Sequence, residues 1–129
     1  MDMKTEGARN LAFVLSEGNG SISRDVVTIV QGAGKLEPGT VLGRFTGGAN
    51  EGKYTPSINV AADPDVGQQV AVAVLAYGVD ATSDDAEAVV IARHAEVKIG
   101  MLFYHSSVDD ATKRAAKVAQ LAAVDIIAR

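Results

Sequence analysis

The chain has 129 residues, 47% of them hydrophobic and 22% charged, which is the composition of one soluble globular domain that buries about two thirds of its unfolded surface. Sixteen acidic residues against twelve basic ones give a formal net charge of −4, the wrong sign for a protein that holds nucleic-acid phosphates. The absence of cysteine excludes disulfides, thiolate catalysis and zinc sites built on cysteine. Aromatic residues make up only 5%, which favours a thin core of small residues over a deep aromatic pocket and disfavours an enzyme.

The N-terminal quarter joins two apolar runs through a polar linker. Residues 1–10 are polar and carry both charge signs without a period, so we expect them to be mobile when free. Residues 11–15 predict a short strand, and a linker rich in Gly, Asn and Ser leads from it to a β-branched run. Asn19-Gly20 is a dipeptide that closes hairpins. Two interpretations therefore stay open: a hairpin that pairs residues 11–15 with a later strand, or an arm that grips another molecule.

The middle of the chain predicts short strands separated by glycine and proline. Residues 26–30 and 40–45 have strand composition, and Pro38-Gly39 predicts a tight turn between them. Residues 47–53 predict a surface loop. Residues 54–62 predict an edge strand, because a proline near the start of a strand is tolerated mainly at an edge.

The next part of the chain predicts the centre of the sheet. Residues 70–79 are apolar on both faces and therefore predict the central strand. An acidic link at 80–87 leads to two segments of strand composition, residues 88–94 and 97–104, with a break or bend near Ala95-Glu96 and near Gly100.

The C-terminal part predicts the one helix of the chain. We expect Ser106 or Ser107 to cap it. Its apolar stripe at helical spacing consists of Ala111, Ala115, Val118, Leu121 and Ala122. A last short strand is expected at residues 125–128. The sum is a mainly β single domain with seven or eight short strands and one C-terminal helix.

The motifs for catalysis are incomplete. Residues 47–53 approach a phosphate-binding loop, but Tyr54 stands where a Ser or Thr must bind magnesium, and Pro56 blocks the helix that should follow. His105 and Asp109 flank two serines, yet neighbours in sequence rarely point at one another, so helix capping explains them more economically than a hydrolytic triad. We therefore expect no catalytic residue, cofactor or metal. The start of the chain has no secretory signal and no run reaches the roughly 18 apolar residues of a membrane span, so we expect a protein made in the cytosol without a membrane partner.

Five segments spread over residues 11–129 occur in a distinctive order. They are LSEGNGSISRDVVTIV, KLEPGTVLGRF, LAYGVDAT, AEAVVIARHAEV and DDATKRAAKVAQLAAVDIIAR. Together these segments resemble the lambda-type head decoration protein family of tailed phages. No single segment is specific, but five in the correct order are hard to obtain by accident.

The resemblance implies a small β-clip-like domain that forms a homotrimer. It implies a capsid decoration, or cementing, protein of the virion that binds the outside of the expanded phage head at threefold and quasi-threefold sites. There it would stabilise the shell against internal DNA pressure. The implied partner is the major capsid protein, with no nucleic acid, no membrane and no cofactor, and the implied place of synthesis is the host cytoplasm.

The resemblance also implies a division of the chain. Residues 1–24 would be an arm that orders on the capsid by adding β structure to the capsid protein, and residues 25–129 would be the folded decoration domain. The residues expected to bind the capsid are Phe13, Val14, Leu15, Ser16, Glu17, Gly18, Asn19, Ile22, Ser23 and Arg24.

Two other classes of protein stay open. A trimeric β-clip enzyme or binding module for nucleotides or sugars would need a polar, acidic pocket between subunits, built on Asp63, Asp65 or Asp80. A β-rich adaptor would bind a host protein instead.

Overall fold

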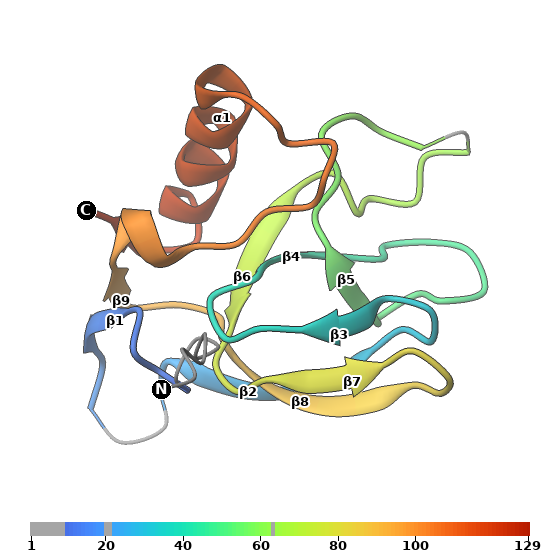
Figure 1. Ribbon diagram of the computed structural model, residues 1–129, viewed down its shortest axis with the longest axis horizontal. Helices are drawn as coiled ribbons and strands as arrows, with labels where there is room; N and C mark the ends of the chain where they lie inside the picture. Colours follow the sequence, from blue (N-terminus) through green and yellow to red (C-terminus); the bar gives the residue numbers. More distant parts are fainter. Residues whose placement is uncertain (1–9, 20–21, 63) are drawn as a thin grey trace, which may run out of the picture.

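Five strands close into a barrel in the order β2-β5-β4-β6-β8 (Figure 1). The computed structural model describes residues 10–19, 22–62 and 64–129. In these ranges the elements are β1 (Val14–Glu17), β2 (Arg24–Ile29), β3 (Gly34–Leu36), β4 (Val41–Arg44), β5 (Tyr54–Pro56), β6 (Ala71–Leu75), β7 (Val79–Ala81), β8 (Ala86–Ile91), β9 (Ala95–Val97), the 3₁₀-helix η1 (Ile99–Met101), α1 (Ala111–Ala122) and β10 (Ile126–Ala128). The mainly β class with one C-terminal helix is confirmed, whereas ten strands replace the expected seven or eight.

Strand β6 lies between β4 and β8, and four of its five residues are buried. The prediction of a central strand is therefore confirmed for Ala71–Leu75. The strand is shorter than expected: its ladder with β8 ends at Leu75, the N–H of Ala76 makes one more bond to the carbonyl of Val89, and the N–H of Gly78 donates to the Asn10 side chain, 3.1 Å away. Val79–Ala81 then forms β7, which pairs with β3 in a separate two-stranded sheet.

The turn before β4 has the conformation that its sequence predicts. Gly39 has φ +97, a value that L residues rarely adopt. A Cβ on Gly39 would lie 2.6 Å from the carbonyl oxygen of Met101. Glycine is therefore needed here for both its backbone freedom and its lack of a side chain. The loop expected at residues 47–53 is also present, between β4 and β5.

A three-stranded sheet with the order β1-β9-β10 lies at one end of the barrel (Figure 1). β9 is its middle strand, antiparallel to β1 and parallel to β10. The break expected near Ala95-Glu96 lies just before these residues, because β8 ends at Ile91, His94 has φ +51 and β9 begins at Ala95. The bend expected near Gly100 is present as η1. The strand expected at 97–104 is wrong: beyond β9 the N–H of Met101 bonds back to the carbonyl of Lys98, 3.0 Å away, and forms η1.

Two other strand predictions need correction. The strand expected at residues 54–62 ends at Pro56; the N–H of Ser57 still donates to the carbonyl of Val41 in β4, 3.0 Å away, and the regular ladder stops there. The expected edge position is wrong as well, because β5 pairs with both β2 and β4. The hairpin considered at Asn19-Gly20 does not join β1 to β2, since β1 pairs with β9; Gly20 itself lies outside the described residues.

The helix begins later than predicted. Its N-cap is Asp110, whose carboxylate accepts a hydrogen bond from the N–H of Lys113 at 2.8 Å. Ser106 and Ser107 precede the helix, and Ser107 is held in a turn by His105. Of the expected apolar stripe, Leu121 is buried and Val118 is half-buried, whereas the alanines at 111, 115 and 122 are exposed. The second buried position of the helix is instead Lys117.

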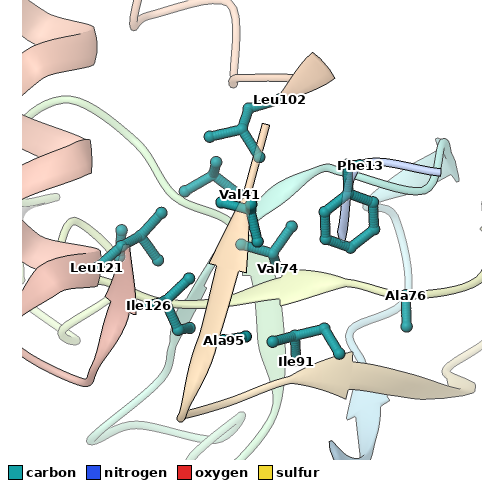
Figure 2. Close-up of a cluster of buried hydrophobic side chains, with 11 residues drawn as sticks. Phe13, Val41, Val74, Ala76, Ile91, Ala95, Leu102, Leu121 and Ile126 are labelled. Atoms are coloured by element: carbon teal, nitrogen blue, oxygen red, sulfur yellow. The ribbon is translucent and has the colours of Figure 1, made fainter. Parts of the chain in front are cut away.

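Two clusters of small apolar side chains form the core, as expected from the composition. Because side chains alternate along a strand, Leu42, Ala73 and Leu75 join one cluster, whereas Val41 and Val74 join the other. The second cluster also takes in Leu121 of α1 and residues of β9 and β10. Figure 2 shows Phe13 projecting into this second cluster.

Candidate functional site

The ten predicted binding residues all lie within residues 13–24, called the N-terminal segment below. Its first half forms β1, which is an edge strand because only β9 pairs with it among the described strands. Val14 faces Val97, and Ser16 and Glu17 face Glu96 and Ala95. The register shifts between Val14 and Ser16, so Leu15 bulges out of the ladder and is 47% exposed.

Phe13 anchors the start of the segment. Its side chain is 1% exposed and packs in the core cluster that contains Val41 and Val74 (Figure 2). Its carbonyl accepts a hydrogen bond from the N–H of Lys98 at 2.7 Å. A ring so deeply buried fixes the strand to the body of the protein. The structure thus places Phe13 as an anchor, and its side chain offers no surface to a partner in this conformation.

Ser23 ties the two ends of the central loop of the segment together. Its Oγ accepts a hydrogen bond from the N–H of Gly18 at 2.7 Å and donates one to the carbonyl of His94 at 2.9 Å. The same N–H of Gly18 also lies 2.8 Å from the His94 carbonyl oxygen. Ser23 is fully buried, which shields its hydroxyl from water. The hydroxyl therefore holds the backbones of Gly18 and His94 next to Ser23.

Glu17 and Arg24 form a second tie at the same place. Arg24 Nη2 lies 2.6 Å from Glu17 Oε1, and Arg24 Nε lies 3.0 Å from Oε2. Arg24 also donates to the hydroxyl of Tyr77 at 3.1 Å. The hydrogen bonds from Arg24 lower the pKa of Glu17 from its usual 4.5, and Glu17 raises the pKa of Arg24.

Arg93, two residues beyond the end of β8, bonds to the side of the loop that leads into β2. Its Nη1 donates to the carbonyl of Ile22 at 2.8 Å, and its guanidinium pairs with the carboxylate of Asp25. Sequence reasoning missed Tyr77, Arg93 and His94 as supports of the segment. These residues lie 53 to 76 positions away from the groups that they bind, and no local pattern signals such contacts.

The structure divides the ten predicted capsid-binding residues into three groups. Phe13 and Ser23 are buried. Val14, Glu17, Gly18 and Arg24 are half-buried, and Leu15, Ser16, Asn19 and Ile22 are exposed. Two of the exposed side chains are large and apolar, since Ile22 is 53% exposed and Leu15 is 47% exposed. The segment therefore combines a free strand edge with exposed apolar side chains, an arrangement that can accept an extended segment of another protein.

A hollow of about 740 Å³ lies beside α1. Apolar side chains from η1, the following loop and the helix line most of it: Ile99, Leu102, Phe103, Val108, Ala111, Ala115 and Val118. Phe103 is 44% exposed there. Arg114 stands over the ring of Tyr104, with its guanidinium carbon 5.6 Å from the ring centroid. This hollow is a large apolar feature of the surface outside the N-terminal segment.

The acids considered for a sugar or nucleotide site do not line this hollow. Asp65 accepts a hydrogen bond from the N–H of Gly67 in an exposed turn, and Asp80 does the same for Thr82. Asp63 lies outside the described residues. Asp65 and Asp80 thus act as turn residues here.

Among the described residues, no three His, Asp or Glu side chains gather as a metal site. In the same ranges, no helix is long and apolar enough to cross a membrane. The barrel presents an edge strand, β1, and exposed apolar side chains beside it.

A family model described as bacteriophage lambda head decoration protein D matches residues 3–126. The chain belongs to this family, and the resemblance inferred from the five segments is confirmed. The search of curated proteins found no match. Membership of a head decoration family supports a structural role on the capsid of a phage particle.

Proposed function

We propose that this protein is a cementing protein that binds the outer surface of the expanded phage head and stabilises it against the pressure of packaged DNA. The observation that carries the proposal is the family match over residues 3–126, joined to an exposed N-terminal edge strand. The proposed partner is the major capsid protein. The protein would be made in the host cytoplasm and act without catalysis or a cofactor.

The N-terminal segment is the proposed capsid-binding part of residues 1–24. Leu15, Ser16, Asn19 and Ile22 would contact the shell directly, because these side chains are exposed. Phe13, Ser23 and the pair of Glu17 with Arg24 would act by holding the segment in place. An added strand gains main-chain hydrogen bonds along the edge, and apolar side chains beside it add specificity.

A homotrimer would strengthen this binding. One short segment gains little after the entropy of ordering is subtracted. Three segments on one rigid body bind together, which raises the apparent affinity by about 10² to 10⁴ over a single attachment. A trimer matched to threefold and quasi-threefold sites of the shell can engage all three segments at once.

Co-sedimentation with expanded shells of the cognate phage tests the role of the segment. The double variant Leu15→Ser with Ile22→Ser should lose binding, because both side chains are exposed and their loss leaves the core intact. Val60→Ser is the matched control: Val60 is 68% exposed and lies in the connection between β5 and β6, away from β1 in Figure 1. Equal binding by the double variant and the control would contradict the proposed contact surface.

A truncation that removes residues 2–10 separates the role of the chain end from that of the segment. It keeps Phe13 and every hydrogen bond that ties the segment. Lost binding would assign contacts to the first ten residues, and unchanged binding would assign them to residues 13–24. Analytical ultracentrifugation of the free protein measures the trimer directly, and a monomer at micromolar concentration would contradict the proposed stoichiometry.

A further inference from the structure

Lys117 is a buried lysine on a helix that is otherwise largely exposed. It is 1% exposed and lies one turn before Leu121, on the face of α1 that packs on the protein. Its Nζ donates to Ser57 Oγ at 3.0 Å, to the carbonyl of Ile58 at 2.5 Å and to the carbonyl of Gln69 at 2.5 Å. An ammonium group has three donors, so each of them has a partner.

All three acceptors are neutral. None of the ion pairs formed by the described residues includes Lys117. Burial lowers the pKa of Lys117 below 10.5, with no charged neighbour contributing to the shift. A buried ammonium without a counter-charge is unfavourable unless its hydrogen bonds compensate for lost hydration. The contacts of Lys117 with residues 57, 58 and 69 must therefore be strong ones, as charge-assisted hydrogen bonds are.

These acceptors come from the two ends of one long connection. Residues 57–70, called the β5–β6 connection below, join β5 to β6 without a strand in their described part. Ser57 and Ile58 begin the connection and Gln69 nearly ends it, so the ammonium lies where the two ends meet. Ser57 Oγ also donates to the carbonyl of Gln68 at 3.0 Å across the place where the two ends meet, called the neck below. A loop with its ends close together is a compact surface unit that can keep its shape without regular secondary structure.

Neighbouring contacts hold the neck to the same region. The N–H of Asn59 donates to Ser107 Oγ at 3.0 Å, just before the helix. The N–H of Ala71 donates to Gln120 Oε1 at 2.8 Å, within the helix. Beyond the neck, Val60 is 68% exposed. Connections of this length inside a compact domain are either functional or disordered, and this one is closed by a buried charge.

We propose that Lys117 is a latch that closes the neck of the β5–β6 connection and fixes the shape of the surface that the connection presents. The barrel does not depend on the latch, because its strands are joined by their own ladders, which pair β2 with β8, β8 with β6 and β6 with β4. Without the ammonium, the carbonyls of Ile58 and Gln69 lose a donor and reach water only if the neck opens. The connection then opens locally while the barrel stays closed. This latch is independent of the proposed capsid role.

Hydrogen exchange measured by mass spectrometry tests the latch. Lys117→Met keeps the length of the side chain and removes its donors. Amides of residues 57–71 should exchange about tenfold faster or more, since loss of a hydrogen bond to a charged group weakens local stability by at least a factor of about ten. Strands β2 and β8 should keep their wild-type exchange. Lys113→Met is the control, because Lys113 lies one turn earlier and pairs with Asp109 at the exposed surface.

Unchanged exchange in residues 57–71 of Lys117→Met would overturn the proposal, and so would faster exchange spread equally over the barrel. Ser57→Ala is the second variant, to be used if Lys117→Met does not fold. It removes one acceptor and the bridge to Gln68, so it should raise exchange in the same residues by a smaller factor. No increase confined to the connection in this folded variant would also overturn the latch.

Discussion

Glu17 at the end of β1 and Arg24 at the start of β2 form an ion pair with two hydrogen bonds, at 2.6 and 3.0 Å. Six residues separate them in the sequence. Gly18, which follows Glu17, and Ser23, which precedes Arg24, form the second tie. The two ties close the base of a small loop from which Ile22 projects, 53% exposed. The N-terminal segment is thereby held on the protein before any partner binds, so less ordering is left for the binding step.

Glu17→Gln should lower the free energy of unfolding at pH 7 by about 1 kcal/mol or less, because the pair is partly exposed and solvent weakens it. The effect should depend on pH. The folded-state pKa of Glu17 is lowered, so its stabilisation is present above the unfolded value of 4.5 and is lost as pH falls through the folded value. Urea unfolding from pH 7 to pH 3 measures the difference between wild type and variant.

Glu51→Gln is the matched control for this pair. Glu51 is exposed in the loop between β4 and β5 and joins no ion pair of the described residues. Its replacement should leave the stability within about 0.5 kcal/mol of wild type. A difference between wild type and Glu17→Gln that stays constant down to pH 3 would contradict the role given to Glu17.

Phe13→Ala should destabilise the fold by about 3–5 kcal/mol, the usual result of deleting a buried aromatic ring. The ring is 1% exposed and packs among residues of β4, β6 and β8, so its loss leaves a cavity that these strands cannot close. Denaturant unfolding followed by circular dichroism measures the change. Leu15→Ala, two residues further along the chain, is the control. Leu15 is 47% exposed, so its replacement should lower the free energy of unfolding by less than about 1 kcal/mol. Similar values for the two variants would show that Phe13 is not an anchor.

The sequence predicted the barrel strands best where local composition and burial agree. The two-sided apolar run of β6 was found, since a strand buried on both faces needs apolar residues throughout. The β-branched run of β2 was found from its composition, although only Ile29 of that strand is buried. The prediction of a strand at 97–104 failed although the composition fits a strand, because the ladders of β9 with its two partners both end at Val97, which faces Val14 of β1 and Ala128 of β10. Pairing partners far away in sequence decide such boundaries.

Sequence composition marked the N-terminal segment as a candidate site but did not predict the contacts that hold it on the protein. The Gly/Asn/Ser-rich linker marks the segment, but no local signal distinguishes buried Ser23 from exposed Ser16. In the helix too, the local pattern failed to show which side chains are buried. Periodicity placed alanines 111 and 115 on the buried face, whereas Lys117 occupies it because acceptors 48 to 60 residues away meet its ammonium. Hydrogen-bond partners at that separation cannot be inferred from spacing.

Gly39→Ala should destabilise the protein by about 1–3 kcal/mol. Gly39 has φ +97, and a Cβ would lie 2.6 Å from the backbone oxygen of Met101, so both strain and a clash oppose the substitution. Gly47→Ala is the control, because a Cβ there meets no atom within 4 Å; it should change stability by less than about 0.5 kcal/mol. Thermal and denaturant unfolding of both variants measure the difference. Equal stability of the two variants would contradict the close approach of the Gly39 turn to Met101.

Lys117 and Lys113 should respond to alkaline pH with opposite sign. Burial lowers the folded-state pKa of Lys117 below the unfolded value of 10.5. Between those two values the unfolded chain binds more protons, so wild type should gain stability relative to Lys117→Met as pH rises through this window. The carboxylate of Asp109 raises the folded-state pKa of Lys113. Wild type should therefore lose stability relative to Lys113→Met as pH rises from 10.5 through that raised value.

Urea unfolding of wild type and both variants from pH 7 to pH 11.5 measures these two differences. Comparing each variant with wild type at every pH cancels the titration of the other lysines and tyrosines that the three proteins share. The gain relative to Lys117→Met begins below pH 10.5, and the loss relative to Lys113→Met begins near or above it. A flat difference for Lys117→Met over the whole range would contradict the lowered folded-state pKa of Lys117.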